Sequence, residues 1–337
     1  MTETEMLSKE LLKPRVDFHI HALGNDSDKT TIDTAKERNV LAVALGKRGG
    51  GILENVEELI RYGQEKGVRV IPATEYFVDN VEGIPGKVDL VAMGFNNNHP
   101  STIEWAGSLK VWNAECARRQ VEFLQSKGFT FAELENENQQ ALEMILRGDH
   151  SERAWALALI IASSKKNREA LEKFKSQNIE AWEKTEKEQK LIYPNITNLQ
   201  AKAIWSLILA PGKEGFLSAR PPQKGASEFI RTIHEAGGAV LYSPEKNYDP
   251  QIWQKLQEIG IDGIMLWHGS TLKSPNGVAL SDVVADIKKR GLLILGGSDY
   301  DPTKNHWQIG IGGGNTYISP RRLKEFDDYL TKIRDGK

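Results

Sequence analysis

The stretch Val16-Asp17-Phe18-His19-Ile20-His21 is an apolar run with polar residues at alternate positions. Such alternation predicts a β-strand, and it opens a region in which strand and helix patterns alternate along the chain. We expect strands over 16–21, 40–45, 68–73 and 88–95, and helices over 31–38 and 53–66. This rhythm is typical of a parallel sheet, either open or closed into a barrel.

The alternation stops near residue 101 and resumes near residue 226. Between them the patterns are almost all helical, and residues 164–190 intersperse lysines with glutamates, which favours a solvated helix face over an RNA-facing surface. Beyond residue 226 we expect strands over 239–242, 263–267 and 292–295, and helices over 227–236, 250–259, 280–290 and 321–334. The expected fold class is α/β, with a barrel-like domain of residues 1–100 and 220–337 and a helical insertion of residues 101–219.

The charge balance of the chain limits its partners. Its 337 residues include 44 Lys and Arg and 46 Asp and Glu, which gives a net charge of −2. This balance provides no global basic field, so we expect no long duplex nucleic acid, although a local basic cleft stays open. The single cysteine, Cys116, excludes an intrachain disulfide framework and a Cys-based zinc finger. We find no signal peptide and no apolar run of roughly 20 residues, so we expect a cytoplasmic protein with no membrane partner.

Polar side chains stand where several of the expected strands end. His19 and His21 lie two residues apart on one strand, so both imidazoles point to one face and can converge on a cation. Asp26 and Asp28 follow that strand. Further carboxylates stand at the ends of two other expected strands: Glu75 after the third, and Asp299 and Asp301 after the last. Barrels place active sites at this end of their strands, and a His and carboxylate set suits Zn, Mn or Fe. The sequence therefore predicts a metal site.

Five segments, in order along the chain, resemble the motifs of a known family. They are residues 16–21 with Asp26, then 72–75 (Pro-Ala-Thr-Glu), 236–244 (Ala-Gly-Gly-Ala-Val-Leu-Tyr-Ser-Pro), 260–264 (Gly-Ile-Asp-Gly-Ile) and 297–301 (Gly-Ser-Asp-Tyr-Asp). The sequence resembles the PHP (polymerase and histidinol phosphatase) family, and within it the nucleotide-phosphatase branch known as 3′,5′-nucleotide bisphosphate phosphatase or RNase AM. The resemblance implies a distorted (β/α)7 TIM-like barrel with a helical insertion, and metal-dependent phosphoester hydrolysis at a site that is usually trinuclear.

Several metal-binding histidines of that family are replaced here. Gly46, Ser243 and Asp301 stand at three such positions, and Asp89 aligns near a fourth. The ligands that the resemblance retains are His19, His21, Asp26, Glu75 and Asp299. The resemblance therefore implies a divalent metal, Zn, Mn or Fe, with one or two ions in place of the trinuclear cluster.

A glycine-rich run with two cations, residues 46–51 (Gly-Lys-Arg-Gly-Gly-Gly), follows the second expected strand. Successive glycine N–H groups can form an anion nest, to which Lys47 and Arg48 add positive charge. Our hypothesis is that Lys47 or Arg48 supplies charge that a metal once supplied, and binds a phosphate or carboxylate. The alternative is a flexible turn with two solvated cations.

Three further residues are candidate substrate contacts. Arg118 and Arg119 match an Arg-rich helix that lines the cleft in the resembled branch, and a role at the surface is the alternative. His268 follows the expected strand over 263–267 and could face the site, with a structural or surface role as the alternative.

Two classes of function remain open. In the first, the cation lowers the pKa of bound water, and the hydroxide attacks the phosphorus of a small phosphoester, nucleotide or oligonucleotide end. Lys47, Arg48 and Asp301 are the candidate catalytic residues. In the second, the chain is a catalytically silent barrel that binds an anionic ligand or a protein partner. Convergence of the retained ligands favours the enzyme, and a Lys47–Glu75 salt bridge favours the silent barrel.

Overall fold

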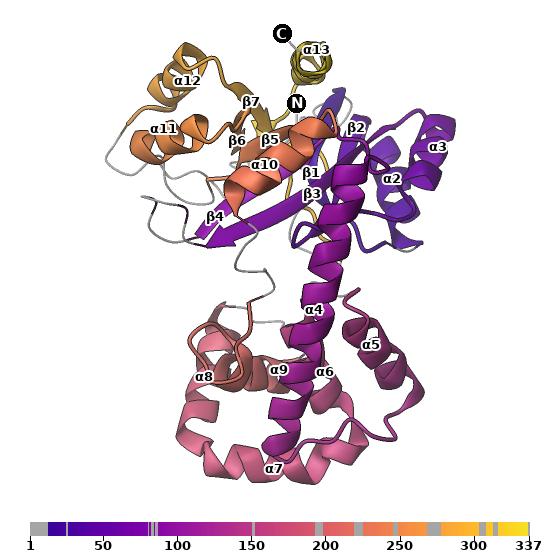
Figure 1. Ribbon diagram of the computed structural model, residues 1–337, viewed down its shortest axis with the longest axis vertical. Coiled ribbons are helices and arrows are strands. Elements are labelled where there is room, and N and C mark those ends of the chain that lie inside the picture. Colours follow the sequence, from indigo (N-terminus) through magenta and orange to yellow (C-terminus); the bar gives the residue numbers. More distant parts are fainter. Residues whose placement is uncertain are drawn as a thin grey trace, which may run out of the picture. The chain divides into compact units, whose positions relative to one another are not determined.

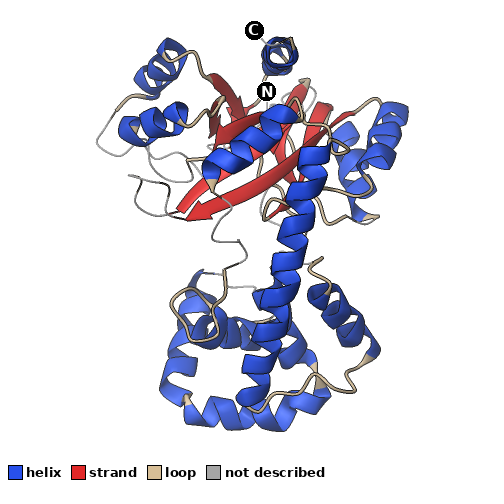
Figure 2. Ribbon diagram, viewed as in Figure 1, coloured by secondary structure: helices blue, strands red, loops and turns tan. Residues whose placement is uncertain are grey.

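The computed structural model describes residues 13–24, 26–79, 81, 84, 87–149, 152–192, 198–218, 225–244, 249–267, 278–302, 308–312 and 316–335. The chain divides into two compact units (Figure 1). The first unit joins Met1–Ala106 to Gln223–Lys337, and the second unit is Gly107–Pro222. Among the described residues, every strand lies in the first unit and the second unit is helical (Figure 2). The domain limits read from the sequence stay a prediction.

The first unit alternates strands and helices along the chain. Before the second unit the elements are β1 (Arg15–His21), α2 (Ser27–Glu37), β2 (Val40–Arg48), α3 (Val56–Lys66), β3 (Arg69–Asp79) and β4 (Lys87–Met93). After it come α10 (Ala226–Glu235), β5 (Ala239–Tyr242), α11 (Pro250–Glu258), β6 (Gly263–Trp267), α12 (Leu280–Lys289), β7 (Leu293–Gly296), β8 (Ile311–Gly312), β9 (Thr316–Tyr317) and α13 (Arg321–Arg334). The described part of the chain is thus mixed α/β, as the alternating sequence pattern predicts.

Seven strands form one sheet in the order β1-β2-β3-β4-β5-β6-β7. All neighbours pair in parallel except β4, which is antiparallel to both β3 and β5. A wholly parallel sheet was expected, and the direction of β4 corrects that expectation. Residues 80–86 alone connect β3 to β4, and a parallel crossover needs about a dozen residues or more, so this connection can join only antiparallel strands.

Both faces of the sheet are buried. On one face, strand side chains pack against α13, among them Phe18, Ala44, Ala73, Val91, Leu241 and Leu295 against Phe326 and Leu330. On the other face, Leu45 and Val70 pack with Ile32 of α2 and Leu59 of α3. A strand that is buried on both faces reads as a continuous apolar run, which explains the patterns of β2, β5 and β6.

The chain beyond β7 hydrogen-bonds to β1, at the opposite edge of the sheet order. The Asp299 N–H donates to the His19 carbonyl at 3.0 Å, and the His21 N–H donates to the Tyr300 carbonyl at 2.8 Å. Ile20 and Tyr300 accordingly form an isolated parallel bridge. These bonds place the residues after β7 beside the end of β1.

The second unit has its own helices and its own core. Most of α4 (Pro100–Ser126) belongs to it, followed by α5 (Asn136–Leu146), α6 (Arg153–Ser163), a 3-10 turn (Lys165–Asn167), α7 (Arg168–Gln177), α8 (Ile179–Ile192), α9 (Leu199–Ile204) and a π-helical turn (Trp205–Leu209). Leu157 and Ile161 of α6 pack with Trp182 of α8 and Ile204 of α9. The apolar clusters of the first unit share none of these residues.

Arg153 is a buried cation at the start of α6. Its guanidinium donates to Asn113 Oδ1 at 2.7 Å and to Gln120 Oε1 at 3.0 Å, both on α4. It also donates to the carbonyl oxygens of Leu217 and Ser218, at 2.6 and 2.8 Å. Burial lowers the pKa of Arg153, but a guanidinium stays protonated because its ordinary value lies so high. These bonds tie the start of α6 to α4 and to the chain that leaves the unit.

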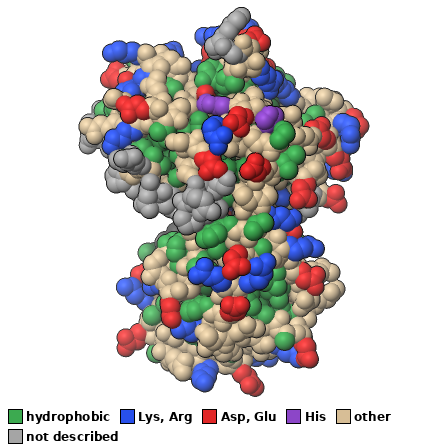
Figure 3. Space-filling model, in the orientation of Figure 1, with side chains coloured by type: hydrophobic (Ala, Val, Ile, Leu, Met, Phe, Trp, Pro, Cys, Tyr) green, Lys and Arg blue, Asp and Glu red, His purple; other side chains and the backbone are tan. Residues whose placement is uncertain are grey.

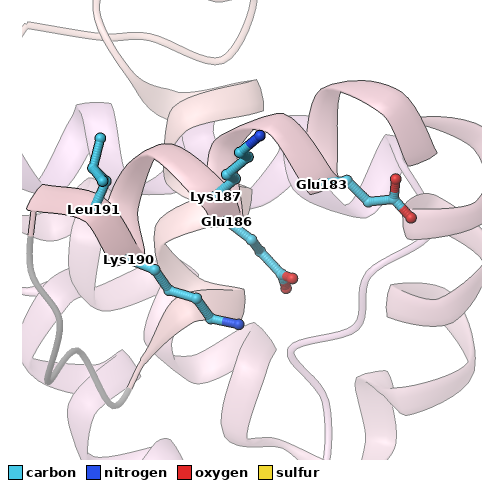
Figure 4. A pocket seen from close by; sticks show the side chains of 5 residues that line it. All are labelled: Glu183, Glu186, Lys187, Lys190 and Leu191. Carbon is cyan, nitrogen blue, oxygen red and sulfur yellow. The ribbon is translucent and has the colours of Figure 1, made fainter.

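Charged side chains of both signs cover the described surface. On the face shown in Figure 3, Lys and Arg are interspersed with Asp and Glu. A shallow hollow along α8 is lined by Glu183, Glu186, Lys187, Lys190 and Leu191 (Figure 4). All five of these side chains come from that single helix. Among the helices that the structure describes, none combines the length and apolar character needed to cross a bilayer.

Candidate metal centre

A β-bulge in β1 sets the position of the two histidines. From Asp17 to Ile20 the strand takes three residue steps while β2 takes two, from Val43 to Leu45. A bulge shifts the alternation of side chains by one position. His19 and His21 are each 3% exposed, and their ring centroids lie 4.9 Å apart at an interplanar angle of 68°. Both imidazoles therefore occupy one buried place.

Asp299 approaches the histidines from the segment after β7. Its Oδ1 lies 2.7 Å from His21 Nε2 and 3.8 Å from His19 Nε2. Asp299 has a φ of +57°, a left-handed conformation that Asp tolerates better than most residues. Gly297 permits this approach, since a Cβ at residue 297 would lie only 2.4 Å from the backbone nitrogen of His19. The backbone thus brings a carboxylate from the far end of the sheet against β1.

His19, His21 and Asp299 form a group of metal-ligating type. Each offers one ligand atom, and these atoms all lie within 4.8 Å of one another. Two imidazole nitrogens and one carboxylate oxygen form an N/O set of the kind that holds Zn, Mn or Fe. Three protein ligands also leave a coordination position for water or substrate. The donor chemistry and the convergence of these residues fit a divalent cation.

Asp17 holds the two segments together. Its Oδ1 accepts the Ser298 N–H at 2.9 Å and the His19 N–H at 3.2 Å, and its Oδ2 accepts the Gly310 N–H at 2.7 Å. Burial raises the pKa of the Asp17 carboxyl, and hydrogen bonds from the Ser298 side chain and from these backbone donors oppose that rise. Asp17 was not among the candidate site residues predicted from the sequence. A carboxyl two residues before a candidate ligand on a buried strand was the available signal.

A second group of charges adjoins the histidines. Arg48 and Glu75 stand opposite each other in the pairing of β2 with β3. Arg48 Nε lies 3.6 Å from Glu75 Oε2, and Arg48 Nη1 lies 3.1 Å from Asp301 Oδ2. Glu75 Oε1 in turn lies 3.7 Å from His19 Nε2. Ion pairs therefore connect Arg48 and Asp301 to the histidine group.

A small cavity separates these side chains. Its volume is about 10 Å³, and its lining includes His19, His21, Gly46, Thr74 and Glu75. Gly46 is in register with both His21 and Ala73, and a Cβ on it would lie 2.8 Å from the Ala73 carbonyl carbon. The tight approach of β2 to β3 therefore admits no side chain at residue 46, and β2 contributes Arg48 two residues later.

Lys47 and Arg48 are neighbours on β2, so their side chains point to opposite faces of the sheet. On β2, Leu45 faces the layer of α2 and α3, whereas Ala44 faces the opposite layer. Alternation therefore points Lys47 with Leu45 and Arg48 with Ala44. A Cβ built on Gly24 would lie 3.2 Å from Lys47 Cε, so the lysine side chain runs beside that loop. A catalytic role for Lys47 stays a prediction.

Asp26 lies apart from the described metal-ligating group. It is an exposed residue at the start of α2 and makes no capping side-chain bond. Its neighbour Asp28 is buried and accepts the N–H groups of Leu23 and Gly24, at 2.9 and 2.8 Å. Asp28 thus shapes the loop after β1, and a metal-ligand role for Asp26 is a prediction that these contacts do not test.

Of the three candidate substrate contacts, the structure describes two. Arg118 and Arg119 lie on α4 in the second unit, where Arg118 Nη1 pairs with Glu115 Oε2 at 2.8 Å. His268 lies outside the described residues. Roles for all three stay predictions. Two positions where the resembled family has histidine, Asp89 and Ser243, are buried and joined by a hydrogen bond from the Ser243 N–H to the Asp89 carbonyl.

Two solved structures resemble this fold over nearly the whole chain. A proposed metal-dependent phosphoesterase from Bifidobacterium adolescentis gives a TM-score of 0.61, at 14% identity over 93% of this chain and 95% of its own. An amidohydrolase from Chromobacterium violaceum, solved with bound sulfate and no metal, gives a TM-score of 0.58, at 18% identity over 92% of this chain and 96% of its own. Identities this low establish a shared fold alone. No family model and no curated protein matches the sequence.

Proposed function

We propose that this protein is a metal-dependent hydrolase with a PHP-type distorted (β/α)7 barrel. The observation that carries the proposal is the convergence of His19, His21 and Asp299 from the two ends of the sheet order. The hydrogen bonds between β1 and the chain after β7 support closure of the sheet into a barrel. The two structural neighbours, a proposed phosphoesterase and an amidohydrolase, support a hydrolytic reaction.

In this proposal His19, His21 and Asp299 hold a divalent cation. A cation bound there supplies Lewis-acid polarisation and lowers the pKa of water toward neutrality. Glu75 places a carboxylate beside His19, where it can accept a proton from an attacking water. Arg48 holds Glu75 and Asp301 in place and keeps positive charge beside the reacting group.

We propose a small phosphoester, nucleotide or short oligonucleotide end as the substrate. The near-neutral net charge of the chain suits a small anion better than a long duplex. Lys47, Arg118, Arg119 and His268 are proposed contacts for its negative groups. The Chromobacterium violaceum neighbour gives a second candidate, because its named activity is on an amide and it holds sulfate. A single-metal site of the present composition suits either reaction.

One observation favours the silent alternative. A salt bridge on Glu75 was expected in a silent barrel, and Glu75 does have one, but from Arg48 and not from Lys47. Pairing to Arg48 leaves the histidines and Asp299 together as a ligand set. The ion pair therefore engages one carboxylate oxygen of Glu75, Oε2, and leaves Oε1 beside His19 and the ligand set in place.

Metal content tests the proposal. Purified protein is incubated with Mn²⁺ or Zn²⁺, desalted and subjected to elemental analysis, beside Asp299→Ala and the double variant His19→Ala with His21→Ala. We expect bound metal in the wild type and a loss of at least tenfold in both variants, while circular dichroism shows a retained fold. Asp328→Ala, which removes a surface ion pair with Lys324, is the matched control and keeps its metal.

Turnover then separates the substrates. Wild type loaded with metal is assayed on aryl phosphates, on nucleotides and on aryl amides, and we expect phosphate release that disappears in Asp299→Ala. Amide cleavage without phosphate release would favour the second candidate function, hydrolysis of an amide. Wild type that holds no metal under any of these conditions would leave the silent barrel as the better account.

A further inference from the structure

Arg48 lies between two buried carboxylates at the candidate metal centre. Its Nη1 is 3.1 Å from Asp301 Oδ2, and its Nε is 3.6 Å from Glu75 Oε2. The side chains of Asp301 and Glu75 are only 5% and 7% exposed. Carboxylates at this burial are strongly destabilised without a cationic partner, so positive charge is required at this place.

Glu75 connects this cation to the histidines. Its Oε1 lies 3.7 Å from His19 Nε2, while its Oε2 faces Arg48. One carboxylate thus offers its two oxygens to two separate positions, a geometry that suits two neighbouring cationic centres. The first of these positions belongs to the group of His19, His21 and Asp299, and the second is filled by the guanidinium.

Building on the proposed function, we infer that the Arg48 guanidinium occupies the place of a second metal ion. The site then accepts one divalent ion per chain, and Glu75 and Asp301 become ligands of a second ion once the guanidinium is removed. A guanidinium is permanently charged at any pH at which a protein folds, so this second positive centre does not depend on metal supply.

The charge of the network supports a single ion. Among the ion pairs given above, Glu75, Asp299 and Asp301 carry three negative charges when ionised, and Arg48 together with one divalent ion supplies three positive charges. The space supports it as well. The cavity between His19, His21 and Glu75 measures about 10 Å³, and about 10–15 Å³ is the smallest volume that holds one water-sized particle.

Counting bound Mn²⁺ tests this inference. The full chain and its variants are saturated with Mn²⁺, passed through a desalting column and measured for metal per chain. Electron paramagnetic resonance then distinguishes an isolated ion from a coupled pair. We expect one isolated ion in the wild type and two coupled ions in Arg48→Ala. Arg48→Lys is the matched control, because it retains a cation at the same position, and it should hold one ion.

The double variant Arg48→Ala with Glu75→Gln locates the second ion. It removes the carboxylate that serves both positions, so we expect one ion again. Arg48→Gln, closer in size to arginine, repeats the measurement if Arg48→Ala melts more than a few degrees below the wild type. The wild-type count is a separate check, because two ions there would overturn the inference whatever the stability of the two variants.

The outcomes separate the two proposals. Two ions in the wild type, or one ion in a folded Arg48→Ala variant, would overturn the role of Arg48 and leave the hydrolase intact. No ion in the wild type but one in Arg48→Ala would overturn the proposed function and support Arg48 as a cation substitute. No ion in any variant would overturn both.

Discussion

At the scale of single residues, Asp17 determines whether the ligands meet. It accepts N–H groups from His19 on β1, from Ser298 after β7 and from Gly310 further along the chain. These three donors are backbone groups, and the Ser298 side chain adds a further hydrogen bond to the carboxylate. The carboxylate of Asp17 is the common element, because its two acceptor oxygens face all of these donors in a buried place.

We therefore predict that Asp17→Asn destabilises the protein. One acceptor oxygen becomes an NH₂ group that faces an N–H donor, and a buried donor left without its acceptor costs about 1–3 kcal/mol. The free energy of unfolding, measured in guanidinium chloride near pH 7, should fall by that amount. Asp328→Asn on the surface is the matched control and should change it by less than about 0.5 kcal/mol. Equal stability of the two variants would mean that the Asp17 carboxyl is already protonated in the native state.

Three of the five ligands predicted from the sequence, His19, His21 and Asp299, lie together in the structure, but the choice between the two cations could not be predicted. His19 and His21 were identified by their spacing on a strand. Lys47 and Arg48 stayed equivalent because the strand was expected to end before them, at the start of a glycine-rich run. In the structure β2 continues to Arg48, paired with β3 as far as Glu75. Pairing with a neighbouring strand extended β2, and alternation then separated the two side chains.

At the scale of elements, Asp262 joins two helices and a strand. It precedes β6, accepts the Tyr329 hydroxyl of α13 at 2.6 Å and the Val240 N–H of β5 at 2.6 Å, and lies 2.8 Å from His234 Nε2 of α10. The hydrogen bond to Asp262 raises the pKa of His234, against an opposing effect of burial. Burial raises the pKa of Tyr329 well above its usual range, so the phenol remains a neutral donor.

His234 should therefore make the stability depend on pH. Its pKa is higher in the folded chain than the value of 6.5 expected when it is unfolded, so the folded state binds the proton more tightly. The stabilisation is complete below pH 6.5 and is lost as the pH rises through the folded pKa. We predict that the melting temperature of wild type minus that of His234→Gln is larger at about pH 5.5 than at about pH 8.5.

The comparison of variants isolates this histidine. All other titrating groups are common to both proteins, so their contributions cancel in the difference. Thr185→Ala, which removes a non-titrating hydroxyl that donates to the Ala181 carbonyl, serves as the control and should show the same difference at both pH values. A difference between wild type and His234→Gln that is constant with pH, or that grows toward alkaline pH, would contradict the predicted sign.

Elements with strong periodicity were predicted well, and the direction of one strand was not. Three matched the structure residue for residue: the strands over 239–242 and 263–267 and the helix over 321–334. The strand over 88–95 was found as β4 but was expected to be parallel. Apolar alternation is the same in either direction, and the short connection over 80–86 was the signal that decided it.

At the scale of the whole molecule, the described apolar clusters of the two units have no residue in common. The second unit packs α4, α6, α8 and α9 around its own apolar cluster, and the first unit buries both faces of the sheet. The break in sequence rhythm indicated an insertion of helices. Local patterns did not predict the bonds of Asp299 and Tyr300 to β1, because pairing between the two ends of a sheet leaves no local pattern in either segment, and only the family resemblance implied a closed sheet.

We therefore predict that metal binding slows hydrogen exchange in the first unit and leaves it unchanged in the second unit. A ligand that binds the native state stabilises it by about 2.7 kcal/mol when its free concentration is about 100 times its dissociation constant. The ion would join β1 to the segment containing Asp299. Opening of the bonds from the Asp299 N–H to His19 and from the His21 N–H to Tyr300 should then become up to about 100-fold rarer.

Hydrogen–deuterium exchange with and without Mn²⁺ or Zn²⁺, followed by mass spectrometry, measures this directly. We predict slower exchange in peptides that cover β1 and residues 297–301, and unchanged exchange in peptides from α6 and α9, which pack in the other core. The double variant His19→Ala with His21→Ala should show no metal effect in either set. Equal slowing in both units would contradict this prediction, because His19, His21 and Asp299 all belong to the first unit.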